Sequence, residues 1–317
     1  MSVDVSVLIP SVAAGPELAG LVCGLLAGSE APTEVVVADN GLDAATLDAL
    51  DGVRVGVRVV AMGGNRGFGT AVNAAARAAT GSVLVVTNDD VRPEEAFVGR
   101  LAAPILTGEA DVTAGVLLMA EDPGRIETAG LQVDAALSGY DYRQGTLASS
   151  LGPDVAPPLG PCGGAAGYSR AVFEALGGYD EGFFAYYEDV DLALRARAAG
   201  ARVALVPDAR ALHATSASTG YASLRKAELV GDSRGYLLRK YGVLRSPGPA
   251  ARALATESLV CFELARRHRS LAPARARVSG YRRGVTSAAM PALGPELVRF
   301  GEGLRRRWER SVRPSAS

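Results

Sequence analysis

The chain has 317 residues, of which 48% are hydrophobic, 6% aromatic and 21% charged. This composition is typical of a folded globular protein and excludes the disordered and fibrous classes. The chain has no stretch of about 18 uncharged apolar residues and no basic N-terminal region, so we expect neither a membrane-spanning helix nor a signal peptide. Its three cysteines are widely spaced and odd in number, which excludes a disulfide framework and favours a reducing cytoplasm.

The formal net charge is −1, but the two ends of the chain differ in sign. Residues 239–317 hold 17 Arg and Lys residues against 5 Asp and Glu residues, whereas residues 1–238 hold 16 against 29. An acidic body with a basic C-terminal region constrains the partners rather than the fold. Three partners fit the basic region: nucleic acid, a membrane surface and the protein's own acidic body.

Across residues 1–90, short apolar runs rich in β-branched residues alternate with helical segments. The expected strands are Val5–Ile9, Glu34–Ala38, Val55–Val60 and Val83–Thr87, and the expected helices cover residues 16–28 and Ala71–Thr80. Because these strands are uniformly apolar, we expect helices on both faces of a mainly parallel sheet.

The rest of the chain is less regular. Residues 121–161 are rich in Gly, Pro, Ser and Asp, which predicts loops with short strands. A helix is expected over Tyr186–Gly200, followed by two short strands at Val203–Val206 and Arg210–His213. Beyond about residue 222 the sequence is basic and its pattern predicts helices.

A glycine-rich loop, Gly-Gly-Asn-Arg-Gly-Phe-Gly, occupies residues 63–69. A dinucleotide-binding fingerprint would follow the first strand and precede an acid by about 20 residues, whereas here Asp39 precedes the glycines. Two interpretations stay open. The loop is either a tight turn into a helix or a segment whose small residues let the backbone approach a nucleotide closely.

Three polar residues, Asn88, Asp89 and Asp90, directly follow the expected strand Val83–Thr87. In an open parallel sheet, ligands bind beyond the carboxyl ends of the strands. Adjacent carboxylates repel each other unless a cation compensates them, and hard oxygen ligands suit Mg²⁺ or Mn²⁺, which in turn hold a diphosphate. The motif indicates either a metal–diphosphate site or an ordinary polar turn.

Acidic residues also open the expected helix near residue 188. Capping explains Glu188 and Asp189 in isolation, and Asp191 with Arg195 is an i,i+4 pair that we expect to be structural. The aromatic segment at residues 183–187 is suited to shield an acid there from water. His213, one of two histidines, ends an expected strand and is either a metal ligand or an ordinary core or surface residue.

Taken in order, these segments resemble the inverting glycosyltransferases of family 2, in particular the rhamnosyltransferase-like branch, over roughly residues 4–245. The resemblance rests on Val5–Pro10 with Glu34–Gly41, Gly64–Asn73, Leu84–Asp90 and Gly177–His213. It implies the α/β fold called GT-A, a mostly parallel sheet with helices on both faces that binds a nucleotide-diphospho-sugar. We therefore expect a glycosyltransferase domain at residues 1–238 and a helical, basic extension at residues 239–317.

The resemblance also implies roles by position. Donor contacts would come from Asp39, Asn65, Gly67, Asn73, Asn88 and Asp89, with Asp39 at the uracil or thymine base. Asp90 and His213 would hold Mg²⁺ or Mn²⁺. Asp189 would be the catalytic base with Glu188 beside it, and Gly163 and Gly164 would line the acceptor side. The loop after Pro10 departs from the family pattern, because Ser11–Ala14 replaces a Thr-Tyr-Asn type.

The expected activity is metal-dependent, inverting transfer of a sugar from a UDP- or dTDP-sugar to an acceptor hydroxyl. The acceptor is a glycan, a lipid-linked glycan or a small molecule. One alternative, a nucleotidyltransferase, needs a basic phosphate-binding loop near the first strand, and Ser11–Pro16 has no Lys or Arg. The other, a nucleic-acid-binding protein, is disfavoured by the few aromatic residues in the basic region.

Apolar residues recur at helical spacing near the C-terminus. Leu297, Phe300, Leu304 and Trp308 lie in the segment Pro295–Ser311, among several arginines. Such a helix either lies in a membrane interface or packs on the acidic body or on an oligomer partner. The expected location is the cytoplasm, with peripheral attachment to the inner face of the membrane as one alternative.

Overall fold

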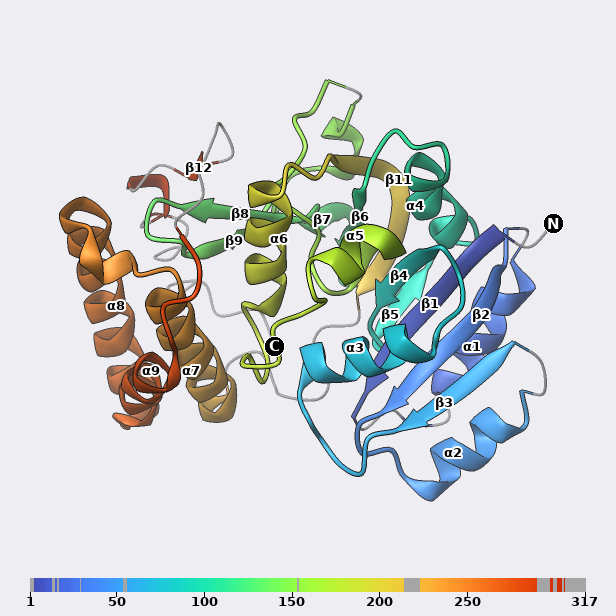
Figure 1. Ribbon diagram of the computed structural model, residues 1–317, viewed down its shortest axis with the longest axis horizontal. Helices are drawn as coiled ribbons and strands as arrows, with labels where there is room; N and C mark the ends of the chain where they lie inside the picture. Colours follow the sequence, from blue (N-terminus) through green and yellow to red (C-terminus); the bar gives the residue numbers. More distant parts are fainter. Residues whose placement is uncertain are drawn as a thin grey trace. The chain divides into compact units, whose positions relative to one another are not determined.

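A computed structural model of the chain describes residues 3–12, 15, 17–28, 30–53, 56–152, 154–213, 223–289, 297–298, 301–303 and 305 (Figure 1). Its contacts divide the chain into two units, Met1–Leu131 with Asp141–Tyr221, and Gln132–Tyr140 with Ala222–Ser317. The boundary expected at 238/239 lies inside helix α7 (Leu224–Lys240), near its end.

The first unit is an α/β structure built, within the described residues, on a nine-stranded sheet. Its strands are β1 (Val3–Ser11), β2 (Pro32–Asp39), β3 (Val57–Ala61), β4 (Val83–Thr87), β5 (Val91–Pro93), β6 (Val112–Met119), β7 (Asp122–Thr128), β10 (Ala165–Ser169) and β11 (Val203–His213). Its helices are α1 (Glu17–Ala27), α2 (Ala44–Asp51), α3 (Phe68–Ala78), α4 (Phe97–Leu106), α5 (Arg170–Ala175) and α6 (Glu188–Ala198), with a 3-10 turn η1 (Ala148–Ser150).

The strands run in the order β3-β2-β1-β4-β10-β6-β11-β5, and β7 pairs with β6. Neighbours among β3, β2, β1 and β4 are parallel, as are β6 and β11. Strand β10 is antiparallel to both of its neighbours, and β5 and β7 are antiparallel additions. The expected mostly parallel α/β sheet is therefore confirmed.

Side chains of the central strands alternate between two buried faces. Leu8, Val36 and Val86 join a core cluster with residues of α3, α5 and α6. Their neighbours Val7 and Val85 point to the opposite face and are equally buried. Helix α1 contacts β2 on that side and α4 contacts β1 and β4 (Figure 1). Both faces are covered, which explains why most side chains of these strands are apolar.

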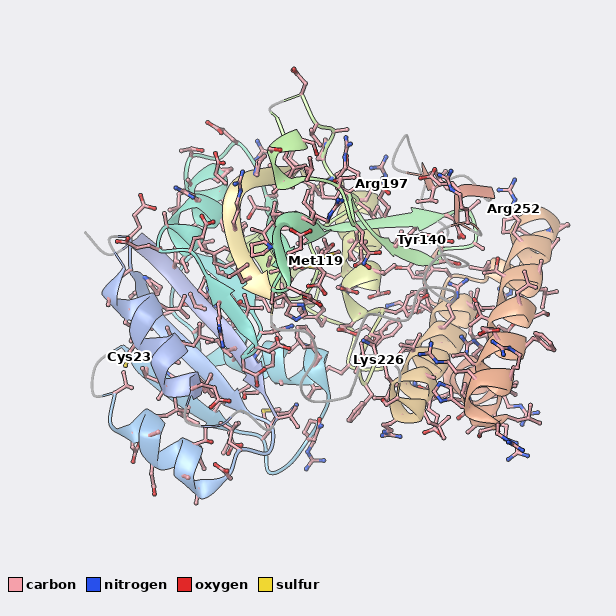
Figure 2. The ribbon with its side chains drawn as sticks, turned by 180° about the vertical axis from the view of Figure 1, so that it is seen from behind. Cys23, Met119, Tyr140, Arg197, Lys226 and Arg252 are labelled. Carbon is pink, nitrogen blue, oxygen red and sulfur yellow. The ribbon has the colours of Figure 1, made fainter. Side chains whose placement is uncertain are left out.

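The expected strands Val203–Val206 and Arg210–His213 form one continuous strand, β11. Its ladder with β6 shifts register between Leu205 and Arg210, where Pro207 lies. Because proline has no backbone N–H to donate, an irregularity in the ladder accommodates it without ending the strand. The strand continues to His213, which pairs with Met119 at the end of β6. Met119 is labelled in Figure 2.

The second unit is helical, as expected for the basic region. It contains α7, η2 (Val243–Arg245), α8 (Pro247–His268), α9 (Ala272–Arg283) and a small sheet of β12 (Leu297–Val298), β8 (Leu131–Asp134) and β9 (Gly139–Asp141). Helices α7 and α9 lie very close together: a Cβ on Gly235 would collide with the carbonyl of Arg277, and one on Gly280 with that of Asp232. None of the helices in the described parts of the chain has the length and apolar character needed to cross a bilayer.

The helix expected over Pro295–Ser311 is wrong at Leu297–Val298, which form a strand, whereas residues 301–303 and 305 are helical. Leu297 belongs to strand β12, where it pairs in parallel with Val133 of β8. Pairing with a distant strand is a non-local contact that helical spacing does not reveal. Phe300, Leu304 and Trp308 lie outside the described residues, so the rest of this expectation stays a prediction.

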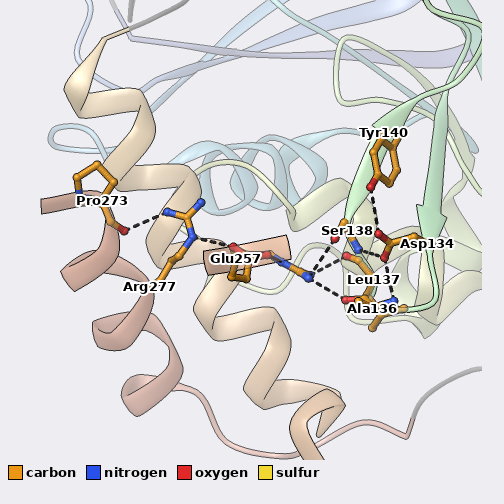
Figure 3. A network of polar contacts seen from close by, with 9 residues as sticks. Asp134, Ala136, Leu137, Ser138, Tyr140, Glu257, Pro273 and Arg277 are labelled. Carbon is orange, nitrogen blue, oxygen red and sulfur yellow. Dashed lines mark hydrogen bonds and ion pairs between the residues drawn. The ribbon is translucent and has the colours of Figure 1, made fainter. Parts of the chain in front are cut away.

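A buried ionic network ties the second unit together (Figure 3). Arg234 of α7, 1% exposed, donates to Glu257 of α8 at 2.7 Å, and Arg277 of α9 donates to the other oxygen of Glu257 at 2.8 Å. The remaining Arg234 nitrogens donate to the carbonyls of Ala136 and Leu137 in the β8–β9 turn. One carboxylate thus joins three helices and, through Arg234, a hairpin from a distant part of the sequence.

We predict that Glu257→Gln destabilises the second unit by about 3–5 kcal/mol, because it leaves two largely buried guanidinium groups without a counter-charge. The matched control is Glu263→Gln on the same helix, which removes an ion pair between Glu263 and an exposed Arg266 and should change stability little. Urea unfolding of both variants measures the difference. Equal midpoints for the two variants would contradict this role of Glu257.

The same network predicts a pH dependence. Burial alone would raise the pKa of Glu257, but the Arg234 and Arg277 guanidinium groups lower it to about 2. A depressed folded-state pKa contributes stability that is complete above about pH 4.5, the unfolded value, and is lost as the pH falls towards 2. The wild-type protein should lose more stability over this interval than Glu257→Gln does.

Candidate functional site

Three strands of the first unit end at one edge of the sheet. Ser11 at the end of β1 pairs with Asp39 at the end of β2, and β4 ends one residue before Asn88. Because β1, β2 and β4 are parallel, their carboxyl ends lie together, where α/β sheets bind ligands. The polar residues singled out in the sequence are therefore brought to a common edge by the strand order.

Asp89 turns back towards β1. The hydroxyl of the fully buried Ser11 donates to Asp89 Oδ2. Burial raises the pKa of Asp89, and the neighbouring charge of Asp90 raises it further, against the bond from Ser11. The departure from the family pattern after Pro10 thus has a structural consequence, since Ser11 holds one of the strand-end acids.

Asp90 faces His213. Strand β5 begins directly after Asp90, and Val91 pairs with His213 at the end of β11. His213 Nε2 lies 3.3 Å from Asp90 Oδ1, a buried oxygen that accepts no hydrogen bond from the part of the chain that the structure describes. The two side chains that the sequence suggested as metal ligands are therefore adjacent.

Glu127 of β7 is a residue that sequence reasoning missed. Its Oε2 lies 2.8 Å from His213 Nδ1, so the imidazole stands between two carboxylates. Burial alone would lower the pKa of His213, but its contacts with Asp90 and Glu127 raise it to about 10. The only signal in the sequence was the alternation of side chains along residues 122–128. This alternation indicates which face of a strand Glu127 lies on but does not identify its partner.

This donor set fits a divalent cation. Asp90 Oδ1 is buried and accepts no hydrogen bond from the described residues, and an imidazole nitrogen faces it. No group of three or more His, Cys, Asp or Glu side chains with metal-binding geometry occurs among the described residues. Two protein ligands suffice for Mg²⁺ or Mn²⁺ sites that also use substrate phosphates and water.

A second acidic cluster opens α6. Glu188 is 6% exposed and its Oε2 has no hydrogen-bond partner among the described residues, whereas Asp189 is half-buried and accepts from the Val190 N–H at 2.8 Å. Burial, and then the charge of Asp189, raise the pKa of Glu188 well above its usual range. Burial and the charge of Asp141 raise the pKa of Asp189 to about 6.

The backbone before α6 is strained. Tyr186 and Tyr187 have φ angles of 68° and 69°, in the left-handed region that bulky residues rarely adopt. Such strain is concentrated at functional sites, where the surrounding structure has to hold it. Beyond the acids, Asp191 pairs with Arg195 at 2.8 Å, which confirms the expected structural pair.

The two glycines expected on the acceptor side lie between Asp189 of α6 and Asn88 at the end of β4. The Gly163 backbone lowers the pKa of Asp189 by hydrogen bonding, so this glycine is adjacent to the expected base. A Cβ on Gly163 would lie 2.8 Å from the Phe68 ring, and one on Gly164 would lie 3.3 Å from Asn88 Nδ2. Close packing at 163–164 therefore places α6, α3 and the end of β4 around one point.

The glycine-rich loop is fixed from two sides. Asn40, 1% exposed, donates to Asn65 Oδ1 at 3.2 Å and accepts from the Arg66 N–H at 2.7 Å. Gly67 has φ 90°, and a Cβ there would collide with the carbonyl of Phe184. Phe68 donates its N–H to that carbonyl at 2.9 Å, so the loop is attached to the aromatic segment before α6.

Two expected donor-binding residues have structural partners. Asn73 donates to the Tyr179 carbonyl at 2.8 Å and accepts the Tyr179 N–H at 2.9 Å, which fixes the segment before α6 to α3. Asp39 Oδ1 accepts the N–H groups of Gly41 and Leu42 at 3.0 and 2.8 Å. Their donor contacts, like those of Asn65, Gly67, Asn88 and Asp89, stay predictions.

Known proteins share both sequence and fold with this chain. The family model "Glycosyl transferase family 2" matches residues 6–177, more than half of the chain. An N-acetylglucosaminyl-diphospho-decaprenol L-rhamnosyltransferase of Mycobacterium tuberculosis is 29% identical over 235 residues, covering 65% of this chain and 74% of that protein. The O-antigen biosynthesis protein RfbC of Myxococcus xanthus is 29% identical over 224 residues, covering 68% of this chain and 17% of that protein.

Two solved structures share the fold at low sequence identity. GalNAc-T7 with UDP, GalNAc and Mn²⁺ gives a TM-score of 0.58 at 17% identity, over 75% of this chain and 48% of that one. The mannosyltransferase PcManGT of Pyrobaculum calidifontis with GDP-Man and Mn²⁺ gives 0.55 at 19% identity, over 88% and 73%. The expected GT-A fold and rhamnosyltransferase-like resemblance are confirmed. The chain belongs to glycosyl transferase family 2 and is a glycosyltransferase.

Proposed function

We propose that the protein is a metal-dependent, inverting glycosyltransferase that uses a UDP- or dTDP-sugar. The observation that carries this proposal is the pair formed by Asp90 Oδ1 and His213 Nε2 at the carboxyl edge of the sheet. Gly164 packs against Asn88 at the same edge, and the backbone of the next glycine, Gly163, hydrogen-bonds to Asp189. A site for a metal-bound diphosphate and a site for a proton-accepting carboxylate are thus neighbours.

Asp90 and His213 would hold Mg²⁺ or Mn²⁺. When bound, the cation supplies positive charge to the diphosphate leaving group. GalNAc-T7 and PcManGT were each solved with Mn²⁺ and a nucleotide, which supports this choice of cofactor. The backbone of the glycine-rich loop, with Asn65 and Gly67, would lie against the donor. Asp39 would contact the uracil or thymine nucleobase of the donor.

Asp189 would accept the proton of the acceptor hydroxyl. A hydroxyl is a poor nucleophile near neutral pH, and a general base is most useful when its pKa lies near the working pH. Burial and Asp141 raise the pKa of Asp189 to about 6, which suits this role. If the activated hydroxyl attacks opposite the leaving group, one displacement inverts the anomeric carbon.

The acceptor is best sought among lipid-linked glycans. The M. tuberculosis relative acts, by its name, on an N-acetylglucosaminyl-diphospho-decaprenol. We propose an acceptor of this class, with the protein at the cytoplasmic face of a membrane, and small-molecule acceptors as the alternative. A nucleotidyltransferase and a nucleic-acid-binding protein, the other functions considered from the sequence, gain no support from the family match.

The proposed metal role predicts that chelation stops the reaction. We expect EDTA to abolish transfer from the active UDP- or dTDP-sugar and Mg²⁺ or Mn²⁺ to restore it. Asp90→Ala should lower nucleotide affinity as well as rate, because cation and diphosphate bind together. Product formation by chromatography and nucleotide binding by calorimetry measure the two effects. Full activity in excess EDTA would remove the metal role of Asp90 and His213.

Substitutions at the two acids of α6 are expected to separate their roles. Asp189→Asn should lower kcat by about 10²-fold or more with little change in donor affinity, because a base acts only in the transition state. Wild-type kcat should fall as the pH drops below about 6, where Asp189 becomes protonated.

The matched comparison is Glu188→Gln, which keeps the size of the neighbouring side chain and should have the milder effect. Neighbouring residues of a helix point about 100° apart, so the two acids cannot share one role. An inactive Glu188→Gln enzyme beside a normally active Asp189→Asn enzyme would reverse the assignment.

A further inference from the structure

We propose that Glu127 is a positioning residue for the metal site: through His213 Nδ1 it holds the imidazole so that Nε2 faces Asp90. This inference rests on the proposed metal-dependent function. Its basis is the contact of 2.8 Å between Glu127 Oε2 and His213 Nδ1, beside the 3.3 Å separation of His213 Nε2 and Asp90 Oδ1.

The strand pairing places Glu127 and His213 on one face. Strand β6 pairs with β7 and β11, and the neighbours Ile126 and Leu212 both pack in the cluster on the other face. Because side chains alternate along a strand, Glu127 and His213 point away from that cluster together. Their side chains are only 16% and 14% exposed, so little water competes for the contact.

The chemistry of imidazole makes this contact decisive. A neutral imidazole that binds a metal through Nε2 carries its proton on Nδ1, and a carboxylate that accepts this proton's hydrogen bond fixes both the tautomer and the ring orientation. Glu127 is placed to accept it. Without the Glu127 carboxylate, the buried Nδ1–H has at most a neutral acceptor, whose weaker hydrogen bond holds the ring less firmly against rotation away from Asp90.

The test is Mn²⁺ affinity, measured by electron paramagnetic resonance of free Mn²⁺ with the full-length protein and UDP or dTDP. We expect Glu127→Gln to weaken Mn²⁺ binding about 10- to 100-fold, the usual effect of losing such a partner. Glu121→Gln, an exposed acid just before β7, is the matched control and should bind like the wild type. Binding by Glu127→Gln with wild-type affinity would overturn the proposal.

A double-mutant cycle identifies the route of the effect. If Glu127 acts through the imidazole, Glu127→Gln should have no further effect on Mn²⁺ affinity in a His213→Ala background. An undiminished effect there would assign Glu127 a direct or purely structural role and contradict the proposal. Absence of Mn²⁺ binding by the wild type would contradict the proposed metal dependence itself, so the two failures are distinguishable.

A spectroscopic readout needs no variant. The chain has only two histidines, so ¹⁵N labelling of histidine gives His213 with His268 of α8 as an internal reference. With Mg²⁺ and the nucleoside diphosphate bound, the spectrum of His213 should show a proton on Nδ1 and none on Nε2. The opposite tautomer would overturn the proposal even if Glu127→Gln failed to fold.

A separate observation concerns α8. Leu254, Leu259 and Phe262 are 58%, 56% and 70% exposed. At about 100° per residue they share an arc of about 140° on the side of α8 away from the buried Ala253 and Thr256. Exposed arginines flank this apolar face: Arg252 near one end, drawn in Figure 2, and Arg266 and Arg267 near the other. An apolar face rimmed by arginine is typical of a helix that lies in a membrane interface.

We infer that the apolar face of α8 docks on an anionic lipid surface. The argument is charge complementarity: residues 239–317, which include α8, hold 17 basic residues against 5 acidic ones. Docking there would bring the protein to a membrane-bound acceptor of the proposed class. The inference therefore rests on the lipid-linked acceptor, but it is tested without it.

The test is co-sedimentation of the full-length protein with vesicles of phosphatidylcholine, with and without phosphatidylglycerol. We expect binding only to the anionic vesicles, weakening with salt, and at least about tenfold weaker for the double variant Leu259→Ser with Phe262→Ser. Val285→Ser is the control, because Val285 is equally exposed but lies outside α8. Undiminished binding by the double variant would overturn the proposal.

The remaining outcomes identify other occupants of the face. Loss of binding only on deletion of residues 295–317 would assign membrane contact to the C-terminal segment instead and contradict the role of α8. A wild-type dimer in light scattering that the double variant converts to a monomer, without vesicle binding by either, would assign the face to a second copy of the chain.

Discussion

The pairing of β5 with β11 is the constraint on which the candidate site depends. Strand β5 is three residues long, yet it begins directly after Asp90 and pairs Val91 with His213. This antiparallel contact fixes an acid from one part of the sequence beside an imidazole from another. Because β11 is also held by β6, and β6 by β7, the same arrangement delivers Glu127 to the far side of the imidazole.

The first unit concentrates buried and half-buried acids at this edge. Asp89 and Asp90 are adjacent, as are Glu188 and Asp189, and burial raises the pKa of Asp89, Glu188 and Asp189. Such groups cost folding free energy unless something compensates them, and perturbed acids gathered at one place are typical of functional sites. The proposed divalent cation at the first pair and the proposed proton from the acceptor at the second would supply this compensation.

Local patterns in the sequence predicted the elements that depend on local properties. Strand β4 has the expected bounds Val83–Thr87. Helix α6 begins at Glu188, so the acidic residues form its first turn as expected. The predictions that were wrong depend on pairing between distant strands. Pairing with β6 keeps β11 a single strand across Pro207, and pairing with β8 makes Leu297 part of a strand instead of a helix. Glu127 was missed for the same reason, since its role exists only once three strands are paired.

The central claim is that Asp90 and His213 hold a divalent cation beside the donor diphosphate. Anomalous diffraction from crystals grown with Mn²⁺ and UDP or dTDP tests it most directly. The account predicts one strong manganese peak about 2.0–2.3 Å from Asp90 and His213 Nε2. Bound nucleotide with its diphosphate at this edge and no manganese at these two residues would contradict it.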